Sequence, residues 1–192
     1  MSNIEKAQAA DIIGSAITKT LGAGESASAK GVYTMQCFDK DGNLKWEAEC
    51  PNLVVNEGLQ DMNNKYFLGS AYTATWYIGL YGAAASNTPA AGDTLAIHAG
   101  WTEITPYTGN RISATFAAAT NANPSVVTNT ASKAQFTITA AGPTTVGGAF
   151  LCSVASGTSG TLFSAADFSS PGDRSVVAGD VLSVTYTFSL SA

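Results

Sequence analysis

The chain has 192 residues, 45% of them hydrophobic, and a formal net charge of −5. This apolar content excludes disorder along the whole length, and the length suits a single core of the β-sandwich type. The negative charge argues against nucleic acid or an anionic membrane as a partner, and no run of about 18 apolar residues predicts a transmembrane helix.

Residues 4–21 predict a helix with a narrow apolar stripe, because Ile13, Ile17 and Leu21 recur at four-residue spacing. The Gly- and Ser-rich segment 22–31 follows as a flexible linker. A helix of about 18 residues is marginal by itself in water, so the stripe is expected to pack on the body, on other copies or on a larger assembly. We therefore take residues 1–31 as an N-terminal arm and the three stripe residues as candidate partner-binding residues.

The start of the chain lacks the basic-then-apolar order of a signal peptide, since Glu5 and Asp11 stand where positive charge belongs. We expect the chain to fold in the cytoplasm where it is made. The cysteines agree, because an odd number cannot all pair and a reducing compartment keeps thiols free. Cys37, Cys50 and Cys152 are predicted to be free and partly buried.

A β-hairpin is predicted over residues 32–50, where two alternating segments flank the turn dipeptide Asp41-Gly42. This turn sets a register that places three opposed pairs on one apolar face: Tyr33 with Cys50, Met35 with Ala48, and Cys37 with Trp46. Cys37 then lies about 14 Å along the strand from the point opposite Cys50. A disulfide allows only about 7 Å between Cα atoms, so these two cysteines are not expected to pair.

A second helix is predicted over residues 56–68, with Asn56 as its N-cap and acidic residues in its first turn. Gly69 is expected to end it. Its predicted buried face consists of Leu59, Met62, Tyr66 and Phe67.

From Thr75 onward the hydrophobic period is two. Strands are predicted at 76–81, 103–107, 111–116, 134–140, 145–154, 160–164, 175–177 and 181–190, with turns at 121–125 and 156–160. In the last strand the side chains expected to point inward are Leu182, Val184, Tyr186, Phe188 and Leu190. Short strands at such intervals predict a mainly β body over 32–192, folded as an antiparallel, jelly-roll-like β-sandwich that includes the hairpin and the second helix.

No residue pattern points to catalysis or to a cofactor. His98 is the single histidine, and it is predicted to be a loop residue packed near Trp101. The acidic pairs that could run glycosidase chemistry are Asp93 with Glu103, and Asp173 with Asp180. Each pair lies beside Gly or Pro, where aspartate commonly stabilises turns, so turn roles are favoured. We expect neither an enzyme nor a bound cofactor.

Two further patterns have a structural explanation. Asp39, Asp41 and Asn43 resemble a calcium-binding loop, but Cys50 stands where the loop needs a glutamate, and the hairpin explains all three residues without a metal. Gly147-Gly148 lies inside a strand pattern, where it predicts a bulge or a close backbone approach.

The aromatic residues leave two interpretations open. Side chains that could stack on sugar rings are Trp76, Tyr77, Tyr81, Trp101 and Tyr107. Trp76 and Tyr77 point to opposite faces of one strand, so a two-sheet arrangement buries at most one of them. Core and subunit-interface positions are favoured, because interfaces also bury aromatics, and a carbohydrate-binding module stays an alternative.

Charge is distributed unevenly along the chain. Residues 66–192 hold three basic and five acidic residues, whereas residues 1–65 hold six and nine. A free cytosolic monomer relies on surface charge for solubility. A surface so poor in charge suits a protein that is covered by copies of itself or by a partner.

Segments of residues 52–190 carry a resemblance to a known kind of protein. They are 56–59, 65–80, 92–103 with Tyr107 and Arg111, 148–151, 160–165 and 179–186. Together they resemble small virion structural proteins of tailed bacteriophages, of the head-decoration or cement type. The resemblance implies no catalytic residues. It implies a capsid component, often trimeric, that is assembled in the host cytoplasm, lies on the outer capsid surface and binds the major capsid protein and copies of itself. A tail or head-fibre component that contacts the host is the alternative virion role.

Overall fold

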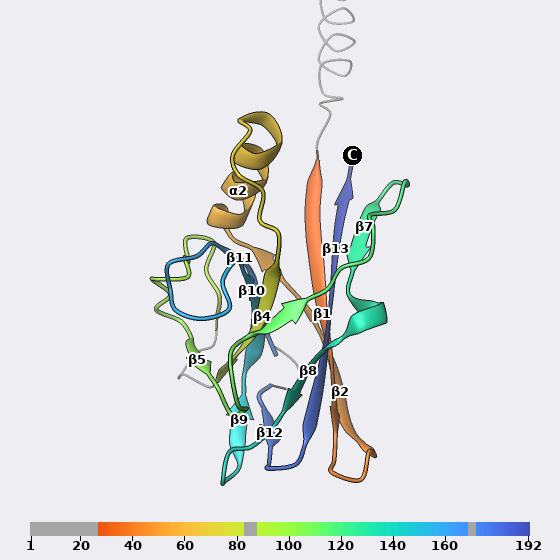
Figure 1. The fold of residues 1–192 in the computed structure, drawn as a ribbon, viewed down its shortest axis with the longest axis vertical. Coiled ribbons are helices and arrows are strands. Elements are labelled where there is room, and N and C mark those ends of the chain that lie inside the picture. Colours follow the sequence, from red (N-terminus) through yellow and green to blue (C-terminus); the bar gives the residue numbers. More distant parts are fainter. Residues whose placement is uncertain (1–26, 83–87, 169–171) are drawn as a thin grey trace, which may run out of the picture.

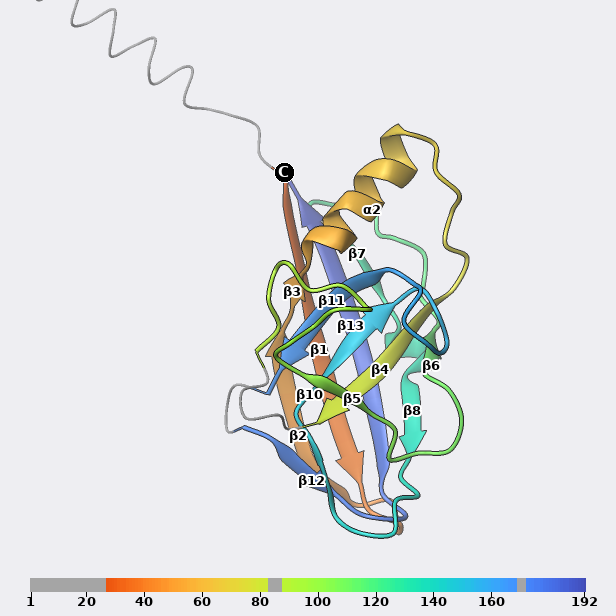
Figure 2. The same cartoon turned by 90° about the vertical axis from the view of Figure 1, so that its left-hand side faces the viewer.

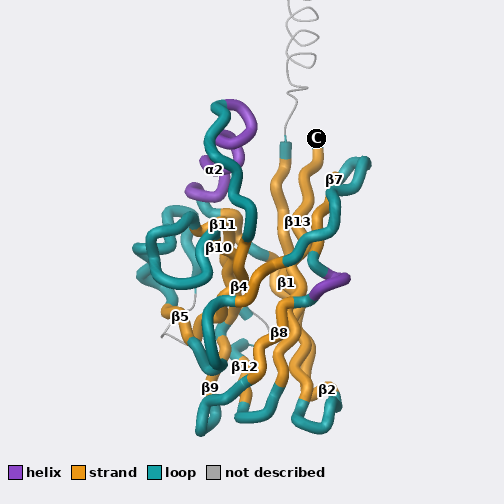
Figure 3. The backbone as a smooth tube through the Cα atoms, viewed as in Figure 1, coloured by secondary structure: helices purple, strands orange, loops and turns teal. Residues whose placement is uncertain are grey.

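The computed structural model describes residues 27–82, 88–168 and 172–192, and this part of the chain is mainly β with antiparallel sheets, as predicted. The predicted helix at 4–21, with Ile13, Ile17 and Leu21, lies outside the described residues. Figure 3 shows that strands and loops make up most of the body, with the α-helix over residues 56–67 at its edge.

The first sheet has the order β2-β1-β13-β7, and β8 also pairs with β13. Its strands are β1 (Ser28–Phe38), β2 (Leu44–Pro51), β7 (Ser125–Thr128), β8 (Ala134–Thr137) and β13 (Val181–Ser191). β1 and β13 are the longest strands and run side by side through the molecule (Figure 1). The short 3-10 helix η1 (Thr130–Ser132) lies between β7 and β8.

The second sheet has the order β3-β11-β10-β4-β5, and β6 also pairs with β4. Its strands are β3 (Leu53–Val54), β4 (Trp76–Gly82), β5 (Thr102–Ile104), β6 (Ile112–Ala114), β10 (Gly148–Cys152) and β11 (Leu162–Asp167). A separate ribbon pairs β9 (Thr144–Val146) with β12 (Arg174–Val176). The strand predicted at 145–154 is therefore two strands, and the turn predicted at 121–125 runs directly into β7.

Both sheets contribute side chains to one hydrophobic core. The first sheet supplies Tyr33, Met35, Phe136, Leu182, Val184 and Tyr186, and the second supplies Ile78, Leu80, Ala149, Leu151 and Phe163. Leu190 was predicted to point inward with the other apolar residues of β13, but it is exposed near the end of that strand.

The alternate side chains of the second sheet form another apolar cluster on its opposite face. Tyr81, Phe150 and Leu162 pack there against Leu95 and Trp101, which lie on the segment between β4 and β5. Both faces of the second sheet are therefore covered, so its strands are apolar on both sides.

The hairpin prediction is confirmed in register. Tyr33 lies opposite Cys50 and Cys37 opposite Trp46, with an irregularity between Cys37 and Phe38. β1 begins at Ser28, and Ser28 pairs with Ser191 at the end of β13. Residues 28–31, which were predicted to belong to the linker, are thus part of a strand.

The helix α2 (Asn56–Phe67) forms close to where it was predicted, but its buried face was predicted wrongly. Leu59, Tyr66 and Phe67 are exposed, whereas Met62 packs against the core. The reason is Gly58, whose missing side chain lets the helix lie directly on β11: a Cβ built there would stand 2.4 Å from the carbonyl oxygen of Phe163.

The ends of α2 also differ in part from expectation. Val55, not Asn56, is the N-cap, and it makes no side-chain capping bond. Its backbone N–H donates to the carbonyl of Phe163 (3.1 Å), so the chain enters the helix directly from the second sheet. At the other end Gly69 has a φ of +67° and Ser70 donates to the carbonyl of Asn64, which ends the helix as predicted. No helix within the described ranges is long and apolar enough to cross a membrane.

Candidate binding surface

His98 packs on Trp101, as predicted. The two rings are stacked with centroids 3.7 Å apart, and His98 Nδ1 lies 2.9 Å from the carbonyl oxygen of Trp101. Trp101 Nε1 donates to Asp93 Oδ2 (3.0 Å), and the same carboxylate oxygen accepts the backbone N–H of Ala90 (2.9 Å). These contacts fix residues 90–101 over the second apolar cluster, so His98, Trp101 and Asp93 have structural roles.

The carboxylate of Glu103 is occupied by Arg111. The guanidinium donates from Nε to Oε1 (2.7 Å) and from an Nη to Oε2 (2.6 Å). It also donates to the carbonyls of Val154 (3.0 Å) and Gly157 (2.9 Å) and lies over the ring of Phe150. Arg111 therefore ties β5 to the segment between β10 and β11, and the bidentate pair leaves Glu103 in a different role from that of a partner to Asp93 in acid–base chemistry.

Asp180 serves a turn, as predicted for this residue. Its Oδ2 accepts the backbone N–H of Val177 (2.9 Å) and an ion pair from Lys45 on β2 (2.5 Å). The carboxylate side chain is 2% exposed. It therefore connects the turn before β13 to the hairpin rather than facing solvent.

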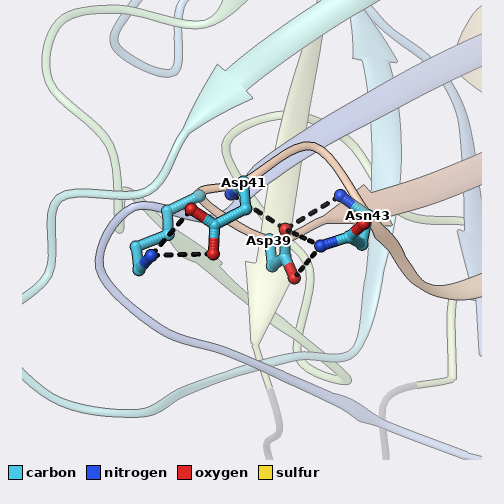
Figure 4. A network of polar contacts seen from close by, with 4 residues as sticks. Asp39, Asp41 and Asn43 are labelled. Atoms are coloured by element: carbon cyan, nitrogen blue, oxygen red, sulfur yellow. Dashed lines mark hydrogen bonds and ion pairs between the residues drawn. The ribbon is translucent and has the colours of Figure 1, made fainter.

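Figure 4 shows how the turn between β1 and β2 uses its acidic residues. Asp39 Oδ1 accepts the backbone N–H groups of Asp41 (2.9 Å) and Asn43 (2.8 Å), and Asn43 Nδ2 donates to Asp39 Oδ2 (3.0 Å). The hydrogen bond from the Asn43 side chain is the main reason why the pKa of Asp39 lies below its ordinary value. The Asp39 oxygens are engaged by N–H groups, and the described part of the chain has no group of three or more His, Cys, Asp or Glu side chains placed to hold a metal ion.

The three cysteines are free and buried, in agreement with the prediction of unpaired thiols. Burial raises the pKa of Cys37 and of Cys50 to about 11, and it also raises the pKa of Cys152. Thiols with such pKa values stay protonated at neutral pH, so they lack the thiolate that reactive cysteines use.

The aromatic residues considered for sugar stacking are mostly interior. Trp101, Tyr81 and Tyr107 are buried. Trp76 packs edge-to-face on Phe163 in the main core, and Tyr77 packs on the second apolar cluster. Trp76 and Tyr77 are each partly buried and neither is fully buried, which agrees with the expectation that at most one of them is buried in the core.

Four large, strongly exposed apolar side chains lie at and just after the C-terminal end of α2. Tyr66 is 84% exposed, Phe67 74%, Leu68 76% and Tyr72 84%. We call these four residues the α2 patch. The rings of Tyr66 and Phe67 contact each other edge-to-face, with centroids 5.0 Å apart. Next to the patch, Lys65 pairs with Asp61 (2.6 Å) and donates to Thr73, which connects α2 to the segment that follows it.

The α2 patch lies at the end of the body where the N-terminal arm joins it. Figures 1 and 2 both place the outer end of α2, the start of β1 and the C-terminus at the same end of the long axis. The arm residues predicted to bind a partner, Ile13, Ile17 and Leu21, lie outside the described residues, so the structure places none of them. The described chain begins next to Ser28 at this same end, which is where the arm is covalently joined to the body.

The sequence contained a signal for the α2 patch that the helical prediction did not use. Tyr66, Phe67 and Leu68 are consecutive. Successive residues on a helix are turned by about 100°, so three in a row cannot all face one core. Some of them had to be exposed.

Comparisons with known proteins give no further assignment. No protein-family model matches the chain, and no curated protein or solved structure shows significant similarity to it.

Proposed function

We propose that this chain is a capsid decoration, or cement, protein of a tailed bacteriophage. It binds the outer surface of the head through the major capsid protein and copies of itself, and it stabilises the lattice by bridging coat subunits. Its body is a jelly-roll-like β-sandwich that acts as a structural part without catalysis, and a homotrimer is the favoured assembly.

The observation that carries this proposal is the scarcity of charge on the surface that residues 66–192 give the body. Residues 66–192 contain eight charged residues, three basic and five acidic. Asp93, Arg111 and Asp180 are buried, and only Lys133 and Asp173 belong to the exposed class. A surface with so few charges is poorly suited to free solution and well suited to burial against other subunits.

Binding to assembled coat protein supplies the stabilising mechanism. A protein that binds the assembled lattice, and not its separated subunits, shifts the equilibrium toward the lattice. A body fixed by two sheets can span a joint between coat subunits without deforming. The end that carries the α2 patch and the arm is the proposed attachment end, because it gathers the apolar side chains that such a contact would bury.

Labelled particles test the virion role directly. Fab fragments raised against the chain are expected to label phage heads at regular lattice positions in electron micrographs, and particles from a phage lacking the gene are the control. Label confined to the tail or to fibres would exclude decoration and support the alternative role in host contact.

Heat stability tests the cement activity. Heads that lack the protein are expected to release DNA at a lower temperature, and adding the full chain back is expected to restore the original value. An Ile13→Ser/Ile17→Ser chain should bind the heads more weakly if the stripe contacts the coat. Restoration by this variant at the wild-type concentration would remove the stripe from the proposed attachment site.

A further inference from the structure

We propose that in the free protein the α2 patch is the docking site for the chain's own N-terminal arm, with the stripe of Ile13, Ile17 and Leu21 lying on the patch. This contact is separate from capsid binding and concerns the isolated chain. It stands whether the particle-labelling experiment places the protein on heads, on tails or on neither.

The patch is large enough to mark a contact site. A Tyr or Phe side chain presents about 150–250 Å². With the exposed fractions given above, the four residues leave on the order of 500 Å² of mostly apolar surface in water. This lies at the upper end of what monomers usually expose, and patches of that size commonly mark a contact site.

The arm begins within reach of the patch. The backbone N–H of Asn52, four residues before α2 begins, donates to the carbonyl of Gly31 in β1 (2.9 Å). From this shared point β1 runs back to Ser28, about 10 Å away at strand spacing. α2 runs toward the same end for 12 residues, about 18 Å of helix.

The linker closes the remaining distance. Leu21 precedes Ser28 by seven residues, which span up to about 23 Å when extended. The stripe from Ile13 to Leu21 is about 12 Å long if helical, which matches the scale of a single helix end. Neither the extended linker nor the helical stripe requires β1 to separate from its neighbouring strands.

The tether favours the chain's own arm over a separate partner. A short flexible linker gives an effective concentration of about the millimolar range, far above the concentration of free copies in a dilute solution. The predicted arm helix is marginal by itself and gains stability from an apolar partner, and the patch supplies one. A second copy or coat protein competes only at high local concentration.

Cysteine trapping tests the contact in the full chain. A chain with Ile17→Cys and Phe67→Cys is mildly oxidised under native conditions, where the three native thiols are buried, and the linked peptides are mapped. The expected result is an intramolecular disulfide that forms at least about tenfold faster than in two controls. One control pairs Lys19→Cys with Phe67→Cys, which moves the thiol off the stripe. The other pairs Ile17→Cys with Asn43→Cys, at the hairpin turn on the opposite end of the body.

The possible outcomes separate clearly. Equal rates in the test and control pairs, or no disulfide at all, would overturn the docking. Disulfides only between chains would overturn it as well and assign the patch to a second copy. The two substituted positions of the body, Phe67 and Asn43, are exposed, and matching thermal unfolding of the reduced variants confirms that the substituted chains fold. Capsid binding is scored on particles, so failure of one proposal does not imply failure of the other.

Discussion

The buried thiols predict that the protein loses stability in mildly alkaline solution. In the folded state burial raises the pKa of Cys37 and Cys50 from 9.0 to about 11. Between these pH values the unfolded chain releases both thiol protons while the folded chain keeps them. The folded state therefore binds more protons than the unfolded state in this range. The contribution of the two thiols to the free energy of unfolding is fully present below pH 9 and is lost as the pH rises toward 11.

The size of the effect follows from the two pKa values. Each thiol lowers the free energy of unfolding by about 1.4 kcal/mol per pH unit within this window. At pH 10 the two together remove roughly 3 kcal/mol, a large fraction of the 5–15 kcal/mol typical of folded domains. Cys152 changes stability in the same direction, because burial also raises its pKa.

Urea unfolding in the presence of a reductant at pH 8, 9 and 10 measures this loss. Cys37→Ala/Cys50→Ala is the matched control, because tyrosine ionisation affects both proteins alike and the difference isolates the two thiols. The variant is expected to be less stable than the wild-type chain at pH 8. The difference between their free energies of unfolding should be roughly 3 kcal/mol smaller at pH 10. A gap that stays constant from pH 8 to pH 10 would refute the argument.

Three substitutions test other contacts by equilibrium unfolding. Gly79→Ala should lower the free energy of unfolding by roughly 1–3 kcal/mol, because the new Cβ would stand 2.3 Å from the Phe150 ring. Adding Phe150→Leu to the same chain should recover part of that loss. If the effects of the two substitutions simply add, the clash is contradicted. Arg111→Met should lower the free energy of unfolding by about 3 kcal/mol, because it leaves Glu103 and two backbone carbonyls unpaired. An unchanged free energy of unfolding would mean that solvent replaces the guanidinium. Asp39→Ala should lower the Tm by a few degrees at neutral pH and less in acid, because its lowered pKa makes the contribution disappear as the carboxylate protonates. Added Ca²⁺ should leave the Tm of the wild-type chain unchanged, and a rise would restore the calcium-loop interpretation.

Local patterns predicted the hairpin in detail. An Asp41-Gly42 turn between alternating strands allows a single register that buries Tyr33, Met35 and Cys37 together, and the structure has that register. The environments of His98 and Asp180 were also foreseeable, because turn and loop roles depend on near neighbours in the chain.

What local patterns missed depends on contacts between distant segments. The buried face of α2 was mispredicted because Gly58, not a large apolar side chain, makes the closest contact with β11. The second apolar layer was missed because Leu95 and Trp101 come from a segment without regular structure, which has no period to detect. Two of the residues that were wrongly predicted to be buried, Tyr66 and Phe67, belong to the α2 patch.

The last strand of the chain has a consequence for synthesis. β13 lies inside the first sheet, where it pairs with β1 along its whole length and also with β7 and β8. Ser28 must therefore find Ser191, so the sheet cannot be completed until β13 has left the ribosome. Such long-range pairing slows folding, and a nascent chain exposes β1 as an unpaired edge throughout translation. A premature stop that removes β13 would leave the β1–β2 hairpin but separate it from β7 and β8, which join the sheet only through β13.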